Sequence, residues 1–124
     1  MSRDLETVLA SYIECALWSS QDWREEGEDP EPFDAWASAD DLAPATVAEM
    51  REDCAAMIAE CDAIDGSDWW TDEQFGHDFW LTRNGHGAGF WDRGQGDAGE
   101  KLTRAAKVYG TVDLYTGDDG LIYA

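Results

Sequence analysis

The most constraining feature of the chain is an apolar helical face between residues 44 and 64. Its members recur in alternating steps of three and four residues: Val47, Met50, Cys54, Met57, Cys61 and Ile64. This spacing lines one side of an α-helix and is typical of a coiled-coil seam. Proline suits the first helical position, and Gly66 suits the stop. We predict a helix over 44–64 that packs on a helix of the same chain or of a second copy, which leaves a homodimer open.

The start of the chain carries a second amphipathic pattern, over residues 3–19. Its apolar side chains have the i, i+3, i+4, i+7 spacing of one helix face: Leu5, Val8, Leu9, Tyr12, Ile13, Ala16 and Leu17. Between 21 and 41 the periodicity is lost, and a glycine and two prolines favour a loop. Trp23, Phe33 and Trp36 are too large to stay in solvent, so we expect them to pin this acidic loop onto the domain.

The middle of the chain predicts a β-hairpin. Thr71 opens a capping-box pattern that fits a single helical turn. Two short apolar runs, 78–83 and 88–92, then flank Asn84-Gly85, a dipeptide typical of tight hairpin turns. We therefore expect these runs to be paired antiparallel strands with stacked aromatic side chains.

The end of the chain predicts one further helix over 97–109 and two strands over 112–116 and 121–124. The expected order is α-α-β-β-α-β-β, an α+β fold in which two N-terminal helices precede a small, mostly antiparallel sheet. The length of 124 residues suits one domain, residues 1–124, with the acidic loop 21–41 inside it.

The charge of the chain is strongly negative and unevenly distributed. Of 28 acidic residues, 21 lie in positions 1–73, where three arginines oppose them, which gives 3 − 21 = −18. Residues 74–124 carry five cations and seven acids, which gives 5 − 7 = −2. Such a field repels nucleic acid and anionic membranes and attracts basic surfaces. We therefore expect neither direct nucleic-acid binding nor membrane binding.

The predicted partner is a basic surface of a host protein, one that itself binds nucleic acid. Carboxylates along a rigid helix can occupy a groove built for phosphates, as a DNA mimic does, and so inhibit a defence enzyme. The predicted partner-binding residues come from the helix and from the loop before it: Glu49, Glu52, Asp53 and Glu60, with Glu25, Glu26, Glu28, Asp29 and Glu31.

Cysteine usage and the first residues bear on the compartment. Three cysteines at unpaired spacing argue against a disulfide framework and favour a reducing compartment. The start of the chain has no apolar leader segment, and no apolar run approaches membrane-spanning length. We expect a cytosolic protein that needs no cofactor and no metal.

An alternative function centres on the segment 77–94. His77, Asp78, His86 and Asp92 are chemically suited to metal binding or acid–base catalysis. In a hairpin, however, His86 would lie at the turn, roughly 20 Å from the open end at 3.3 Å per residue. A structural role for the aromatic and glycine residues of the segment is therefore favoured over a small metal-dependent or ligand-binding enzyme.

The same segment carries a resemblance. His77-Asp78-Phe79-Trp80-Leu81-Thr82-Arg83-Asn84-Gly85-His86-Gly87-Ala88-Gly89-Phe90-Trp91-Asp92-Arg93-Gly94 resembles small proteins of unknown function encoded by tailed phages and related mobile elements. The likeness extends more weakly to 11–18 and 112–120. The family brings no activity with it. The resemblance implies a phage or prophage setting, and hence a protein that acts in the bacterial cytosol.

Overall fold

The computed structural model describes residues 3–22 and 31–124, and this part of the chain is mostly helical. Its α-helices are α1 (Leu5–Ser19), α2 (Pro44–Cys61), α3 (Asp72–Arg83) and α4 (Gly96–Lys107). Short 3-10 turns connect them: η1 (Phe33–Ala35), η2 (Ala39–Asp41), η3 (Ser67–Trp69) and η4 (Phe90–Asp92). The described strands form two antiparallel pairs of two residues each, β1 (Gln21–Asp22) with β2 (Glu31–Pro32), and β3 (Tyr115–Thr116) with β4 (Ile122–Tyr123). The predicted α+β fold with the order α-α-β-β-α-β-β is therefore wrong.

The helix α2 buries its apolar face inside its own chain. Met50, Cys54, Met57 and Cys61 are each no more than 3% exposed, and they pack with α1 in a single core. Val47 and Ile64 lie at the margin of this core, half-buried. The three-and-four spacing is thus explained by packing within one chain, so this pattern no longer argues for a homodimer.

The predicted hairpin is the main error, because residues 72–83 form the helix α3. Thr71 does cap it, since its hydroxyl accepts a hydrogen bond from the Gln74 backbone N–H (3.1 Å). The helix then continues beyond one turn, and every residue from Asp78 to Arg83 is buried. Its neighbours are α1, α4 and η4. The second half of α3, residues 78–83, is enclosed on all sides and has no polar stripe, so its sequence resembles a buried strand.

Asn84-Gly85 ends α3 instead of turning a hairpin. The Gly85 N–H donates to the Thr82 carbonyl (3.2 Å), and the His86 N–H donates to the Leu81 carbonyl (3.0 Å). These are the two hydrogen bonds of a Schellman C-cap, with Gly85 in the left-handed region at φ 71°. The chain then returns along the end of α3, where the Phe90 N–H donates to the Thr82 hydroxyl (3.0 Å). The predicted return strand over 88–92 is the turn η4.

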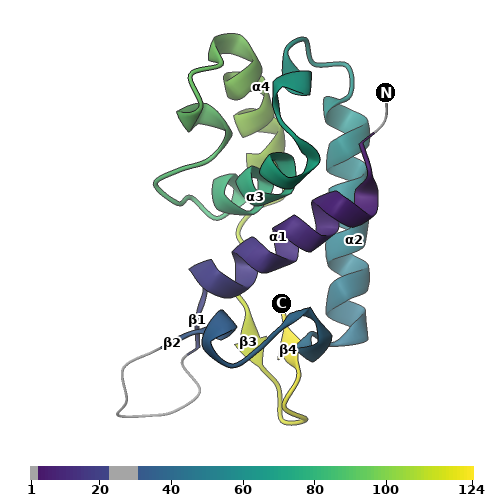
Figure 1. Cartoon of the computed structure of the whole chain (residues 1–124), viewed down its shortest axis with the longest axis vertical. Helices are drawn as coiled ribbons and strands as arrows, with labels where there is room; N and C mark the ends of the chain where they lie inside the picture. Colours follow the sequence, from purple (N-terminus) through teal and green to yellow (C-terminus); the bar gives the residue numbers. More distant parts are fainter. Residues whose placement is uncertain (1–2, 23–30) are drawn as a thin grey trace.

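The helices α1 and α3 pack directly against each other (Figure 1). At the crossing, Gly76 of α3 lies against the backbone of α1, and a Cβ there would collide with the Val8 carbonyl oxygen. Around this contact lies an aromatic cluster in which Tyr12 packs on Phe79 and Trp80, with ring centroids 5.2 and 5.3 Å away. The core of the molecule therefore centres on α1 and α3.

The C-terminal strands attach to the other end of the molecule, away from η3 and η4 (Figure 1). Strand β4 follows β3 through a turn at 117–120, and the sheet is shorter than the predicted strands 112–116 and 121–124. The Ala43 N–H donates to the Ile122 carbonyl (2.9 Å), which ties β4 to the start of α2. Phe33 in η1 is buried and Trp36 half-buried, whereas Trp23 lies outside the described residues. None of the helices within 3–22 and 31–124 has the length and apolarity that crossing a membrane requires.

Candidate functional site

The predicted acidic face is only partly a free surface. Glu49, Glu52 and Glu60 are exposed on α2. Asp53, by contrast, accepts a hydrogen bond and forms an ion pair at 2.9 Å with Arg83, a side chain buried in the core. Asp53 is therefore a structural residue and does not belong with the other three. We define the α2 acidic face as Glu49, Glu52 and Glu60.

Most of the predicted loop residues fall outside the part of the chain that the structure describes. Glu25, Glu26, Glu28 and Asp29 lie outside the described residues. Glu31 has its backbone in β2, paired with Asp22 of β1. The described part of the binding face is thus confined to α2.

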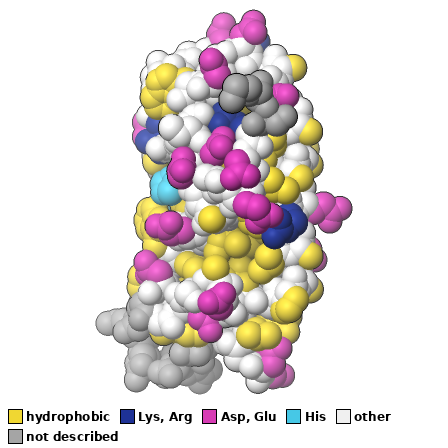
Figure 2. All heavy atoms as spheres, turned by 45° about the vertical axis from the view of Figure 1, so that its right-hand side comes forward, with side chains coloured by type: hydrophobic (Ala, Val, Ile, Leu, Met, Phe, Trp, Pro, Cys, Tyr) yellow, Lys and Arg dark blue, Asp and Glu magenta, His cyan; other side chains and the backbone are white. Residues whose placement is uncertain are grey.

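The arginines that the structure describes before α4 are used in ion pairs within the fold or on its surface. In the described residues before α4, each arginine forms an ion pair with a carboxylate: Arg3 with Asp72, Arg51 with Glu6, Arg83 with Asp53 and Arg93 with Asp78. Lys101 and Lys107 are exposed, and both lie on α4. Figure 2 accordingly shows carboxylates spread over the visible face, with few cations between them. The negative charge of this face is therefore not neutralised locally.

Arg83 is the polar centre of the core. Its guanidinium donates to the Tyr12 hydroxyl (3.0 Å), to Asp53 (2.9 Å) and to the carbonyls of Tyr109 and Gly110 (both 2.9 Å). These groups lie on α1, on α2 and just after α4. Burial raises the pKa of the Tyr12 hydroxyl, against the opposing effect of Arg83, so the phenol stays a neutral hydrogen-bond partner. Arg83 therefore joins three helices to α3.

Asp78 is a second buried polar centre and is fully occupied. It accepts hydrogen bonds from Trp70 Nε1 (2.9 Å), Gln74 Nε2 (2.9 Å), and Arg93 Nε and Nη2 (3.0 and 2.6 Å). This bidentate pair fixes the segment after η4 onto α3 and raises the pKa of Arg93. A carboxylate with this set of donors has a structural role, which argues against Asp78 as a catalytic base or metal ligand.

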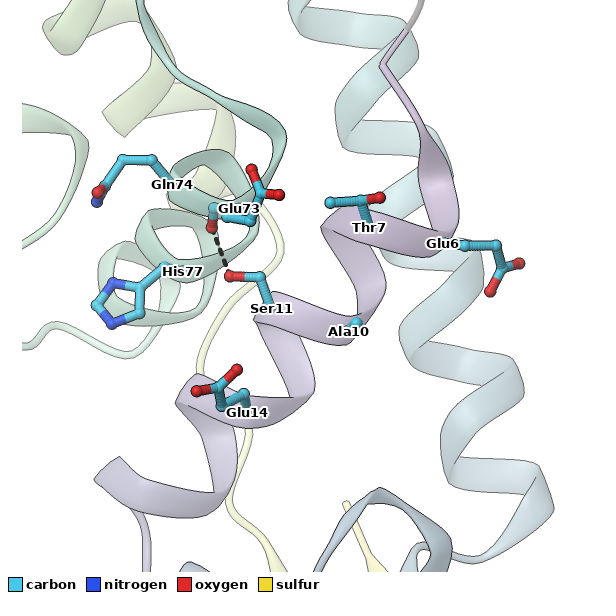
Figure 3. Close-up of a pocket in the computed structure, with 8 residues that line it drawn as sticks. All are labelled: Glu6, Thr7, Ala10, Ser11, Glu14, Glu73, Gln74 and His77. Atoms are coloured by element: carbon cyan, nitrogen blue, oxygen red, sulfur yellow. Dashed lines mark hydrogen bonds between the residues drawn. The ribbon is translucent and has the colours of Figure 1, made fainter.

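A groove of about 620 Å³ lies between α1 and α3 (Figure 3). Its lining brings carboxylates from both helices to one place: Glu6, Glu14 and Glu73, together with Thr7, Ala10, Ser11, Gln74 and His77. The Ser11 hydroxyl donates to the Glu73 carbonyl oxygen at the centre of the groove. His77 stacks on the half-exposed Trp18, with ring centroids 5.7 Å apart. Sequence reasoning missed this groove, because nothing in the sequence indicates that the outer face of α1 borders α3.

The structure does not assemble the alternative catalytic set. His77 lines the groove between α1 and α3, whereas His86 lines a different cavity. Asp78 is buried and held by Arg93, and Asp92 is exposed in η4. Within residues 3–22 and 31–124, no three His, Cys, Asp or Glu side chains are placed to hold a metal ion.

The three cysteines are buried thiols. Burial, more than any neighbouring charge, raises the pKa of Cys15, Cys54 and Cys61 to about 12 each. Reactive cysteines instead have a lowered pKa and an accessible sulfur. These side chains therefore belong to the core.

Comparison of the chain with protein-family models, with curated proteins and with solved structures gives no match. The function must therefore be inferred from the geometry and charge of this chain. The feature that distinguishes it is the exposed surface of α2, whose glutamates form no ion pair with any cation of the described residues.

Proposed function

We propose that the protein binds a basic surface of another protein through the α2 acidic face. The observation that supports this is the placement of the cations. Every arginine described before α4 pairs with another carboxylate, so Glu49, Glu52 and Glu60 are exposed and form no ion pair within the described residues; Glu60 accepts one weak hydrogen bond from the Tyr109 hydroxyl (3.5 Å). Unpaired charges of one sign raise the rate of encounter with the opposite charge.

The partner class that we propose is a protein that binds nucleic acid. Glu49 and Glu60 are eleven positions apart on α2, which spans roughly 16 Å at 1.5 Å per residue. That length corresponds to about five steps along one DNA strand at 3.4 Å each. Helix α2 is anchored through five buried side chains, so its carboxylates are held on a rigid support, as mimicry of a phosphate backbone requires.

The setting that we propose follows the resemblance of the segment 77–94 to phage and mobile-element proteins. On that basis the partner is a bacterial host protein of the cytosol, and a defence enzyme that acts on DNA has the required basic groove. The protein would then inhibit this enzyme by occupying its groove.

The test uses a charge-reversed variant, Glu49→Lys/Glu52→Lys/Glu60→Lys. Wild-type protein is used to capture partners from bacterial lysate, and the capture is repeated with duplex DNA as competitor. We expect DNA to release the partner, and the variant to bind it at least about tenfold more weakly, with a smaller dependence on salt. The salt series runs from about 0.1 M to about 1 M, over which the Debye length falls from about 10 Å to about 3 Å.

The matched control reverses three exposed acids of the other half, Asp92→Lys/Asp97→Lys/Glu100→Lys. This control makes the same change in net charge and leaves α2 intact. The proposal predicts that it retains most of the affinity. Equal losses in the two variants would show that only total charge matters, and binding unaffected by DNA would contradict the proposed partner class.

The enzyme alternative centred on 77–94 has less support. Its two histidines line different cavities, and the carboxylate beside His77 is saturated with hydrogen-bond donors. No arrangement of a base, a nucleophile and a stabilising group emerges among the described residues of the segment.

A further inference from the structure

A second cavity, of about 610 Å³, lies where the end of α1, the loop after α3 and the segment 111–114 meet. Its lining consists of Ser19, Ser20, Trp80, Asn84, His86, Thr111, Val112, Asp113 and Leu114. This volume is in the range of small-molecule sites. The cavity is separate from the α2 acidic face, so an inference about it does not depend on the proposed function.

The inner wall of this cavity is already satisfied by protein hydrogen bonds. Trp80 Nε1 donates to the Ser19 hydroxyl (2.8 Å). The Asn84 amide donates to the Trp80 carbonyl (3.0 Å) and accepts from the Val112 N–H (2.7 Å). Trp80 and Leu114 are buried and supply apolar surface. The wall is therefore fixed in place before any ligand arrives.

The remaining polar side chains of the lining are unengaged. Within the part of the chain that the structure describes, no hydrogen bond or ion pair to another protein group occupies the side chains of Ser20, His86, Thr111 and Asp113. They offer two hydroxyls, one imidazole and one carboxylate. Ser20 and His86 are half-buried, and Thr111 and Asp113 are exposed at the rim of the cavity, where a ligand can reach them. A few polar groups beside apolar walls are the usual composition of a ligand site.

We propose that this cavity binds a small amine that carries several hydroxyl groups. The net charge of −20 disfavours anionic ligands. Asp113, the carboxylate of the described lining, pairs with the ammonium group of the ligand. The side chains of Ser20, Thr111 and His86 exchange hydrogen bonds with its hydroxyls, and Trp80 and Leu114 contact its carbon skeleton.

The probe for the test is glucosamine, measured by calorimetry at low ionic strength. Wild-type protein is expected to bind it at a single saturable site, and to shift the backbone amide resonances of residues 111–114. Asp113→Asn should weaken binding about tenfold, since a hydrogen bond to a charged group is lost. Asp65→Asn is the matched control, because it removes an exposed carboxylate outside the lining. It should bind like wild type.

Two further ligands identify which groups are recognised. Glucose lacks the amine and should bind more weakly than glucosamine. Spermidine has amines without hydroxyls and reports general attraction to the acidic surface, so its binding should be the same in both variants. The proposal is overturned if glucosamine does not bind saturably, if the two variants lose equal affinity, or if glucose binds as tightly as glucosamine. The triple lysine variant of α2 should keep glucosamine binding, which separates this proposal from the proposed function.

Discussion

At the scale of single residues, two ion pairs in and beside the core account for Arg83 and Arg93. Arg83 donates hydrogen bonds to Asp53 and to the Gly110 carbonyl, and so connects two segments far apart in the sequence. Asp78 does the same for Trp70 and Arg93, which both donate to its carboxylate. A buried charge is tolerated only when it is paired and its hydrogen bonds are satisfied, and the two buried charges, Arg83 and Asp78, meet this condition. Because these arginines pair with Asp53 and Asp78, the exposed acids of α2 form no ion pair within the described residues.

The buried thiols make the stability of the protein sensitive to alkaline pH. Cys15, Cys54 and Cys61 each ionise near pH 12 in the fold, against an ordinary value of 9.0. Their contribution is complete below about pH 9. Above it the unfolded state loses thiol protons that the folded state keeps, so the free energy of unfolding falls until about pH 12.

We therefore expect urea unfolding to show a steady loss of stability between about pH 9 and pH 11, by up to about 1.4 kcal/mol per pH unit for each thiol. Cys54→Ala should reduce this slope, because one titrating group is removed. The thiols must be kept reduced and unmodified throughout the measurement. A slope that is the same in Cys54→Ala and in wild type would show that the thiols do not govern the alkaline loss.

At the scale of elements, the close crossing of α1 and α3 determines the architecture. Gly76 allows the two backbones to meet, since any Cβ would strike the Val8 carbonyl oxygen. In an exposed helix interior, glycine to alanine normally stabilises by about 1 kcal/mol. Here the sign should reverse, because the helices would have to separate and the aromatic cluster around Tyr12 would loosen.

We expect Gly76→Ala to destabilise the protein by about 2–3 kcal/mol, as overpacking of a core does. Gly87→Ala is the control, because its added Cβ meets nothing within 4 Å. It should change stability by no more than about 0.5 kcal/mol. Thermal melts of both variants test this, and a neutral or stabilising Gly76→Ala would contradict the crossing.

The sequence predicts some of these elements well and misses others for a physical reason. Helices α1 and α2 each bury one face, so their periodicity is visible. Helix α3 is enclosed by α1, α4 and η4, which removes the polar face that identifies a helix. Asn84-Gly85 suits both a hairpin turn and a helix C-cap, because each requires a residue with positive φ.

The candidate sites divide in the same way. The exposed acids of α2 follow from charge and helical spacing and could be predicted. The pairing of Asp53 with Arg83 and the presence of Glu14 and Glu73 in the lining of one groove depend on how helices cross, which local patterns do not contain. The same holds for the cavity around Asp113, whose lining comes from three separate segments.

At the scale of the whole molecule, the net negative charge lowers the stability of the fold. Uncompensated carboxylates on one region repel one another and destabilise the compact state. Residues 1–73 carry a formal charge of −18, which the two lysines of α4 are too few to cancel. A partner that supplies positive charge would relieve the repulsion, and added salt should do so in its absence.

We therefore expect the Tm to rise when NaCl is raised from about 10 mM to about 150 mM, over which the Debye length falls from about 30 Å to about 8 Å. Glu49→Gln/Glu52→Gln/Glu60→Gln should melt higher than wild type at low salt and gain less from added salt, because its repulsion is already reduced. The matched variant Asp92→Asn/Asp97→Asn/Glu100→Gln removes the same charge from the half that carries only −2. It should keep most of the salt response of wild type. If both triple variants lost that response equally, the repulsion would depend on the total charge of the protein and not on the α2 acidic face.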